Sequence, residues 1–346
     1  MKSGISSTIA LLVLAILVVP IFADRHTLIL AGQSNMVGQG IGEGQGFPDS
    51  IPEIRVWNAS GELSGSWMAL RPGLADDARR FGIELTVGTT LLSALPGDTF
   101  VFLKTAWGGT SIAQDWLPPS SGGPGLVYSR MFQNIHLAQS RWVGEFPKLD
   151  GFLWMQGESD GCAESSADKY RQNLANFVRD VRETLKDTAR PWVLGLIDLQ
   201  PAWPYAYTIR EAQVEVANDL PRMGVVETAG LATDGVHYTA EGLRELGRKM
   251  ATRWLELKGY AIPVMKPGSR TWKSLSGGRL AFVDNGINPL CRVRLIGPDG
   301  HGGQWQRYLG QLVFPATSRP SRGPWFLQVE RRDGTTEVLR VPPVWR

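Results

Sequence analysis

Short apolar runs alternate with longer amphipathic stretches over most of the chain, from residue 26 to about residue 258. Six runs have the length and content of buried strands, at residues 26–32, 53–58, 98–106, 149–156, 191–199 and 222–228. Five stretches have helical character, at residues 82–95, 128–142, 165–185, 207–219 and 239–259. Strands that alternate with helices predict a parallel sheet covered on both faces, which is a three-layer α/β/α fold.

The stretch 165–185 carries the clearest helical pattern. Its apolar residues recur every three or four positions and fall on one face, namely Tyr170, Leu174, Phe177, Val181 and Leu185. A parallel sheet of this kind binds ligands beyond the carboxyl ends of its strands. We therefore expect the functional residues in the loops that directly follow the strands.

The pattern changes after Lys266, where short β-like runs are separated by turn signals. Three dipeptides are typical of tight turns, namely Asn285-Gly286, Asp299-Gly300 and Asp333-Gly334. The sequence therefore predicts one α/β domain over residues 24–261 and a small β-rich C-terminal module over residues 262–346.

The C-terminal module differs in charge from the rest of the chain. It has 13 lysines and arginines against 5 aspartates and glutamates, a net charge of +8, which leaves −5 for the remainder. One interpretation is an appendage that stabilises the protein. The other is a surface for anionic glycan that uses tryptophan side chains, the candidates being Trp272, Trp305 and Trp325.

Residues 1–23 have the features of a signal peptide. Lys2 precedes an apolar stretch from Ile9 to Val19, and Ala23 is a small residue suited to cleavage. A membrane anchor is the competing interpretation, but a bilayer span needs about 20 apolar residues and this stretch has about 11. We expect cleavage after Ala23 and a secreted or periplasmic protein without a stable membrane span.

Composition argues against several classes of function. A net charge of +3 and a pI near 8.9 give no reason to expect a nucleic-acid partner. The two cysteines, Cys162 and Cys291, are too few for a disulfide scaffold, and whether they pair stays open. No Cys/His group has metal-ligand spacing, and the glycine-rich residues 38–46 lack the dinucleotide fingerprint. No metal or other cofactor is therefore expected, and nothing in the sequence indicates the oligomeric state.

Ser34 follows the first apolar run within the turn-prone sequence GQSN. A serine at the end of a strand can cap the next helix or attack a substrate. Late in the chain, Asp234 and His237 lie three residues apart in TDGVHYTAEG. A carboxylate at this separation can accept the Nδ1 proton of the imidazole and leave Nε2 to take a proton from the serine. The order serine, then aspartate and histidine, is that of α/β esterases.

Two further loops offer hydrogen-bond donors for an oxyanion. Gly108 and Gly109 follow the third apolar run and would let the backbone approach a substrate oxygen. Gln156 follows the fourth run and could add a side-chain amide. Taken alone, either loop could be a turn or a helix cap.

Together, four blocks resemble the conserved blocks of the SGNH hydrolases: GQSNM at residues 32–36, GGTSI at 108–112, WMQGESD at 154–160 and DGVHYTAEG at 234–242. They are most similar to the sialate O-acetylesterase-like carbohydrate esterase branch, in which glutamine replaces the asparagine of the third block. The resemblance covers about residues 26–258 and implies a flavodoxin-like sheet. It does not extend to the C-terminal module.

The resemblance implies Ser34 as nucleophile, His237 as general base and acid, and Asp234 as the carboxylate that orients the histidine. It also implies an oxyanion hole formed by the N–H groups of Ser34 and Gly109 and by the amide of Gln156.

Two positions qualify this assignment. Glu158 is an alternative source of the carboxylate that orients the histidine. Met155 stands where members of the branch usually have histidine, so any polar contact from that position is lost.

The function expected from the sequence is an exported serine esterase that removes O-acetyl groups from carbohydrate. An esterase or thioesterase for lipid or small acyl substrates on the same fold is one alternative. A glycan-binding protein without catalysis is another. The expected partner is an acetylated glycan, with xylan, sialic acid and bacterial exopolysaccharide all open. Three aromatic residues could stack on sugar, although packing is the favoured role: Trp107, Trp116 and Tyr128.

Overall fold

The structure is a computed structural model that describes residues 24–42, 47–61, 63–187 and 190–260 and seven strands between residues 270 and 340. The strands of its central sheet are β1 (Arg25–Gly32), β3 (Ile51–Asn58), β4 (Trp67–Leu70), β6 (Thr99–Ala106), β7 (Leu149–Met155), β8 (Trp192–Gly195) and β9 (Met223–Val226). Their order is β4-β3-β6-β1-β7-β8-β9, and every neighbouring pair is parallel except β3 with β4. The six predicted strands are confirmed.

The order of the strands explains where a ligand can bind. From β6 to β9 the sheet has the order β6-β1-β7-β8-β9, which is the 2-1-3-4-5 order of flavodoxin-like folds. Beyond β6, β3 and β4 extend the sheet. The sequence prediction lacked β4 and the paired two-residue strands β2 (Gly40–Ile41) and β5 (Arg80–Phe81). In this fold, ligands bind beyond the carboxyl ends of the strands where the order reverses, which here lies between β1 and β7.

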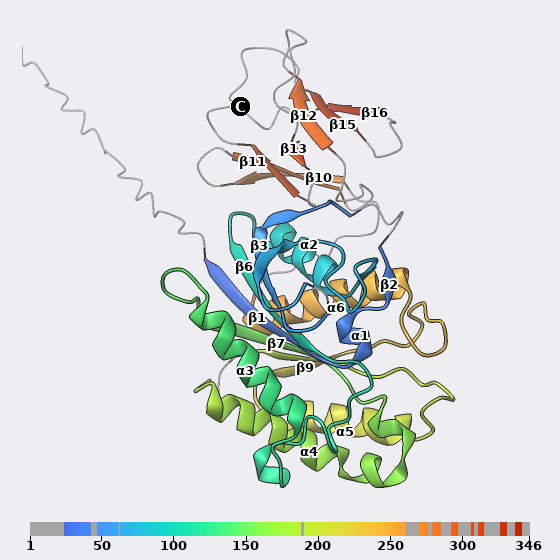
Figure 1. Ribbon diagram of the computed structural model, residues 1–346. Coiled ribbons are helices and arrows are strands. Elements are labelled where there is room, and N and C mark those ends of the chain that lie inside the picture. Colours follow the sequence, from blue (N-terminus) through green and yellow to red (C-terminus); the bar gives the residue numbers. More distant parts are fainter. Residues whose placement is uncertain are drawn as a thin grey trace, which may run out of the picture.

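Helices cover both faces of the sheet, which confirms the three-layer fold. They are α1 (Ser34–Val37), α2 (Glu84–Ala94), α3 (Leu126–Ser140), α4 (Glu164–Thr184), α5 (Ala206–Asp219) and α6 (Ala240–Lys258). Figure 1 shows α3, α4 and α5 on one face and α2 and α6 on the other. Within these layers α2 packs on α6 and α4 packs on α5. All five predicted helices are present, and the short α1 is additional.

The predicted apolar face of α4 is part of the core. Four of its side chains are fully buried, namely Tyr170, Leu174, Phe177 and Val181. The Phe177 ring lies 4.7 Å from that of Trp154 on β7, centroid to centroid. Full burial of one such side chain contributes about 1.5–3 kcal/mol, so this face holds α4 on the sheet.

Two of the three aromatic residues considered for sugar stacking belong to the core. Trp116 and Tyr128 are 0% and 4% exposed, so neither is available to a ligand and the packing interpretation is confirmed for both. Trp107 is half-buried, and the guanidinium of Arg130 lies 5.8 Å from its ring centroid.

The C-terminal region contains antiparallel strands, as its turn-rich sequence predicts. They are β10 (Arg270–Leu275), β11 (Arg279–Asp284), β12 (Arg292–Ile296), β13 (Gln306–Arg307), β14 (Gln311–Phe314), β15 (Phe326–Glu330) and β16 (Thr336–Arg340). They form two sheets, with the orders β10-β11-β14 and β13-β12-β15-β16. The predicted boundary at residue 262 stays a prediction.

Several predicted features fall outside the described residues. These are the signal peptide at residues 1–23, Cys291, Trp305 and Trp325. Cys162 is exposed. None of the helices in the described part of the chain is long and apolar enough to span a bilayer.

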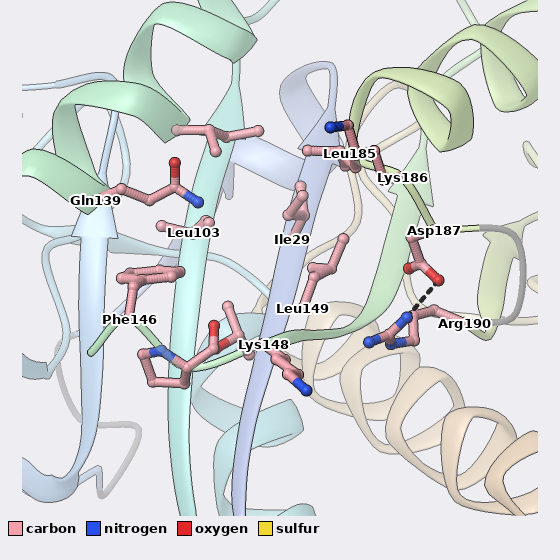
Figure 2. Close-up of a pocket in the computed structure, with 13 residues that line it drawn as sticks. Ile29, Leu103, Gln139, Phe146, Lys148, Leu149, Leu185, Lys186, Asp187 and Arg190 are labelled. Atoms are coloured by element: carbon pink, nitrogen blue, oxygen red, sulfur yellow. Dashed lines mark hydrogen bonds and ion pairs between the residues drawn. The ribbon is translucent and has the colours of Figure 1, made fainter.

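A pocket of about 270 Å³ opens near the amino-terminal ends of β7 and β8. Its lining combines apolar and cationic side chains, among them Ile29, Leu103, Leu149, Lys148, Lys186 and Arg190. Figure 2 shows Arg190 paired with Asp187, at 2.6 Å. The pocket lies at the amino-terminal edge of the sheet and is distinct from the site predicted at the carboxyl edge.

Candidate active site

Three loops that follow strands meet a fourth loop, which precedes a helix, at the carboxyl edge of the sheet. Ser34 follows β1, residues 107–113 follow β6, and residues 156–160 follow β7, whereas His237 lies in the loop before α6. Hydrogen bonds link each of these loops to at least one other. The structure therefore gathers the residues singled out in the sequence at the expected edge.

Ser34 begins the four-residue helix α1 directly after β1. Gly32 ends the strand with φ +147°, and a Cβ on it would lie 2.0 Å from the carbonyl oxygen of Met155. Only glycine allows β1 and β7 to approach so closely here. Among the described residues the backbone N–H of Ser34 has no hydrogen-bond partner, as expected for the first turn of a helix. The side chain of Met155 is fully buried and belongs to the hydrophobic core.

Ser34 and His237 are in direct contact. The Oγ atom of Ser34 lies 3.1 Å from Nε2 of His237, although 203 residues separate them in the chain. This distance permits proton transfer from the hydroxyl to the imidazole. Both side chains are half-buried, so a substrate can reach them.

Asp234 does not make the bond to the imidazole that its spacing suggested. Its Oδ1 accepts hydrogen bonds from the backbone N–H groups of Val236, at 2.9 Å, and His237, at 2.7 Å. These two bonds lower the pKa of Asp234. Within the described residues no hydrogen bond joins its carboxylate to the His237 ring. The reason is the tight turn over residues 234–237, which directs the carboxylate to the backbone.

Gln156 is also used differently from the prediction. It is fully buried, and its Nε2 donates to Asp160 Oδ2 at 2.6 Å and to the carbonyl of Thr110 at 3.1 Å. An amide nitrogen has two protons to donate. Both are taken up by buried acceptors, so the amide is not open to a substrate oxyanion in this structure.

Asp160, which the sequence did not single out, holds the loop after β6. Its carboxylate accepts hydrogen bonds from the backbone N–H groups of Ile112 and Ala113, at 2.8 and 3.0 Å, as well as from Gln156. Burial raises the pKa of Asp160 to about 6. Gln156 and Asp160 therefore connect the loops after β6 and β7.

Gly108 and Gly109 lie in the loop that Asp160 holds, and both are exposed. A Cβ on Gly108 would lie 3.8 Å from Cβ of Ser34, which shows how close this loop comes to the serine. Gly109 has φ +68°. In the described structure the backbone N–H of Gly109 makes no hydrogen bond. This N–H group is therefore free to donate, and its role as an oxyanion donor stays a prediction.

Glu158 does not contact the histidine by a hydrogen bond. It is 4% exposed, and its Oε1 accepts a hydrogen bond from Nδ2 of Asn35 at 2.7 Å. Burial raises the pKa of Glu158 to about 7. Glu158 therefore does not orient the His237 ring directly in this structure.

A buried ion pair supports the helix that begins with Ser34. The Nζ atom of Lys104 lies 2.9 Å from Oε2 of Glu84, and both side chains are fully buried. Lys104 also donates to the carbonyls of Val37, the last residue of α1, and Leu74, each at 2.7 Å. Burial lowers the pKa of Lys104. The sequence analysis did not single out Lys104 or Glu84, because their contact joins a strand to a helix and depends on tertiary packing.

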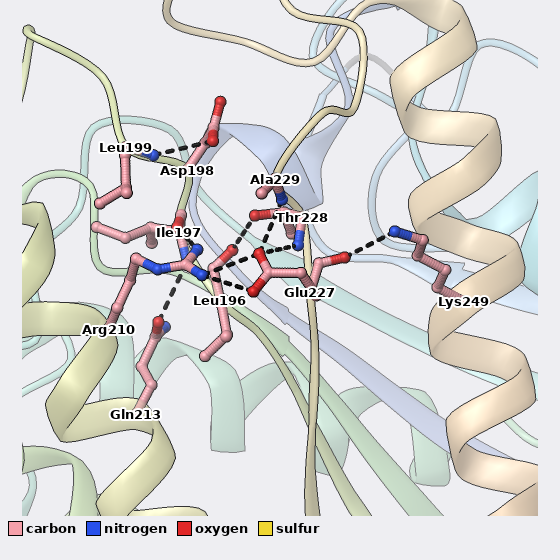
Figure 3. A network of polar contacts seen from close by, with 10 residues as sticks. All are labelled: Leu196, Ile197, Asp198, Leu199, Arg210, Gln213, Glu227, Thr228, Ala229 and Lys249. Carbon is pink, nitrogen blue, oxygen red and sulfur yellow. Dashed lines mark hydrogen bonds and ion pairs between the residues drawn. The ribbon is translucent and has the colours of Figure 1, made fainter.

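The loop that carries His237 is anchored at its start, as Figure 3 shows. The carboxylate of Glu227, which follows β9, accepts hydrogen bonds from Arg210 at 2.7 and 2.9 Å and from the N–H groups of Thr228 and Ala229, both at 2.8 Å. Lys249 on α6 donates to the carbonyl of Glu227 at 2.9 Å. This network fixes the chain between β9 and α6.

One group in the described part of the chain lies close enough to share a metal ion, namely Asp24, His26 and Asp98. It lies at the amino-terminal edge of the sheet. Burial alone would lower the pKa of His26, but hydrogen bonds with Asp150 and Asp98 raise it above its ordinary value of 6.5. Both ring nitrogens are therefore engaged by carboxylates, which fits an ion-pair network better than a metal site.

The strand order and the serine–histidine contact at the carboxyl edge define the class of the SGNH-type hydrolases. The chain belongs to the carbohydrate esterase, sialic acid-specific acetylesterase family, whose model matches residues 24–256. A probable carbohydrate esterase of Arabidopsis thaliana is 25% identical over 247 residues, which cover 67% of this chain and 90% of that protein.

Solved structures agree with the fold. The structure of that Arabidopsis protein has a TM-score of 0.56 at 22% identity and covers 69% of this chain and all of its own. NanS has a TM-score of 0.54 at 15% identity, with 69% of this chain and 98% of that chain covered. A carbohydrate acetylesterase from Xanthomonas citri has a TM-score of 0.50 at 18% identity, with 92% and 81% covered. The predicted family and fold class are thus confirmed.

Proposed function

We propose that the protein is a serine-dependent esterase that removes O-acetyl groups from carbohydrate. The family supports a carboxylic ester hydrolase that acts on an acetylated glycan. The observation that supports the serine mechanism is the 3.1 Å contact between Ser34 Oγ and His237 Nε2 at the carboxyl edge of the sheet. A hydroxyl paired with an imidazole in a half-buried site is an activated nucleophile.

In the proposed reaction, His237 takes the proton of Ser34 through Nε2 while Oγ attacks the acetyl carbonyl carbon. The N–H groups of Ser34 and Gly109 stabilise the oxyanion, and one such donor is worth about 3 kcal/mol. His237 then protonates the departing sugar oxygen. Water, deprotonated by His237, hydrolyses the acetyl-serine and releases acetate. The Gln156 amide has no part in this oxyanion hole, because its protons are committed to Asp160 and Thr110.

Asp234 supports the base by holding its backbone. Two hydrogen bonds from the backbone N–H groups of residues 236 and 237 fix the turn, and they lower the pKa of Asp234. Asp234 is therefore the orienting carboxylate of the proposed triad, and it acts mainly through the turn.

Export is part of the proposal. Residues 1–23 carry the signal-peptide pattern, and a secreted or periplasmic esterase would meet polysaccharide or released sialic acid. Cleavage after Ala23 is tested by N-terminal sequencing of the protein recovered from outside the cytoplasm.

The activity is tested by acetate release from acetylated xylan and from O-acetylated sialic acid. We expect Ser34→Ala and His237→Ala to abolish release, while Ser165→Ala, at an exposed serine on α4, leaves it unchanged. Release that survives Ser34→Ala contradicts the serine mechanism. A faster reaction with butyryl than with acetyl esters would favour the alternative of a lipid or small-acyl esterase.

A further inference from the structure

Asn35 directly follows the proposed nucleophile Ser34, and its side chain is hydrogen-bonded to the residue that follows the proposed base His237. Its Oδ1 accepts a hydrogen bond from the backbone N–H of Tyr238 at 3.0 Å, and its Nδ2 donates to Glu158 Oε1 at 2.7 Å. Ser34 and His237 are the direct sequence neighbours of Asn35 and Tyr238. One amide therefore ties the start of α1 to the loop that carries the histidine.

The orientation of this amide follows from the chemistry of its partners. A backbone N–H can only donate, so the atom that faces Tyr238 is Oδ1, and Nδ2 then faces Glu158. Asn35 is 2% exposed, so solvent does not replace either partner, and an unpaired buried amide is costly. Glu158 thus favours the orientation in which Asn35 can hold the backbone of Tyr238.

The role of Glu158 in this contact does not need a negative charge. Its Oε1 takes the hydrogen bond from Asn35, whereas Oε2 is buried and has no hydrogen-bond partner among the described residues. A carboxyl oxygen accepts a hydrogen bond whether the group is ionised or neutral. The contact with Asn35 therefore requires only that residue 158 has a side chain of this length with a hydrogen-bond acceptor at the Oε1 position.

We propose that Asn35 and Glu158 are positioning residues that keep Nε2 of His237 within hydrogen-bond distance of Ser34. The inference rests on the proposed function, because it assigns the pair a role in the serine mechanism. Displacing a reacting group by about 1 Å can cost about 100-fold in rate. Loosening this tie should therefore lower kcat and leave substrate binding nearly unchanged.

The test compares Glu158→Gln with Glu158→Met in the full chain. Glutamine keeps an acceptor oxygen for Asn35, whereas methionine has a similar length and no such acceptor. We expect Glu158→Gln to keep kcat within about threefold of the wild type, and Glu158→Met to lower kcat by about 30-fold or more with little change in KM. Asn35→Ala should lower kcat about as much as Glu158→Met does. The Asn35→Ala/Glu158→Met double variant should have about the same kcat as Asn35→Ala alone, because the two residues act as one unit.

Each contrary outcome has a distinct meaning. Equal large losses in Glu158→Gln and Glu158→Met would show that the charge of Glu158 acts on His237, which overturns the positioning role. Full activity in both Glu158→Met and Asn35→Ala would overturn it as well. Ser34→Ala is measured in parallel, and activity in that variant would refute the proposed function itself.

A second readout separates positioning from a general loss of structure. The rate at which a fluorophosphonate labels Ser34 depends on activation by His237, and it is measured on protein whose thermal unfolding midpoint is known. We expect Glu158→Met to be labelled about 30-fold more slowly and Glu158→Gln at nearly the wild-type rate. If Glu158→Met does not fold, the contrast between Asn35→Ala and Glu158→Gln decides the question.

Discussion

Replacing Lys104 by methionine tests how the helix of the proposed nucleophile is held. The substitution keeps the length of the buried side chain and removes the ammonium group that contacts Glu84 and the carbonyls of Val37 and Leu74. Glu84 is 0% exposed and would retain one hydrogen bond, from the backbone N–H of Gly82. A carboxylate left without its cation in this position is the main cost.

The size of the effect follows from burial. Removing one partner of a buried ion pair typically costs about 3–5 kcal/mol, because the remaining charge is uncompensated. For a domain of this size the loss corresponds to a fall of about 6–20 °C in the unfolding midpoint. Replacing Glu84 by glutamine in the same chain removes the orphaned charge. The double variant should therefore be more stable than Lys104→Met, and the deficit that remains should come from the two unpaired carbonyls.

Urea unfolding of the wild type, Lys104→Met, and the Lys104→Met/Glu84→Gln double variant measures these differences. Lys169→Met, at an exposed lysine on α4, is the matched control and should change stability by less than about 0.5 kcal/mol. A loss below about 1 kcal/mol in Lys104→Met would refute the argument. A double variant no more stable than the single one would refute it too, since the orphaned charge would then not be the cause.

Three further predictions concern the turn, the oxyanion loop and the opposite edge of the sheet. Asp234→Asn keeps an oxygen that accepts both backbone hydrogen bonds, so kcat should stay within about tenfold of the wild type. Asp234→Ala removes this acceptor and should lower kcat by about 100-fold or more. A loss near 10⁴ in Asp234→Asn would instead mean that the carboxylate holds Nδ1 of His237 during the reaction. Gly109→Ala places a side chain at φ +68°, which costs about 1–2 kcal/mol. The backbone N–H of residue 109 would be displaced, and kcat should fall by about 10- to 1000-fold. Gly259→Ala, at φ +81°, is the matched control and should leave kcat unchanged. The pKa of His26 is raised on folding, so its ion pairs stabilise the protein fully below about pH 6.5 and lose their effect as the pH rises through the folded pKa. In urea titrations, the difference in stability between the wild type and His26→Gln should therefore shrink from pH 5.5 to pH 8.5. A difference that grows over this range would contradict the prediction.

The sheet was predictable because its strands follow from local apolar runs, whereas the serine–histidine contact was expected from the GQSN and DGVH motifs and their resemblance to the SGNH blocks. Strand-like apolar runs fix the parallel sheet, and its carboxyl edge collects the loops after β1, β6 and β7 whatever the details of packing. β4 was missed because its four residues, Trp67–Leu70, are mostly half-buried and lack a clean alternation. The helix α1 has only four residues, too few for a helical period to be visible.

The hydrogen-bond partners inside the site were not predictable, because they depend on distances between loops. Gln156 looks like an oxyanion donor until Asp160 and Thr110 are found to take its protons. Asp234 was expected on the imidazole, and the turn directs its carboxylate to the backbone instead. Asn35 stands in the GQSN motif, but its two partners lie more than 120 residues away in the chain.

The most direct test of the serine mechanism is to trap the acetyl-enzyme. The protein is mixed with excess 4-nitrophenyl acetate, quenched in acid within the first turnovers, digested, and analysed by mass spectrometry. The mechanism predicts one added acetyl group on the peptide that contains Ser34, and its absence in Ser34→Ala. An acetyl group on another residue, or acetate release without any acetylated peptide in a burst experiment, would contradict the assignment of Ser34 as nucleophile.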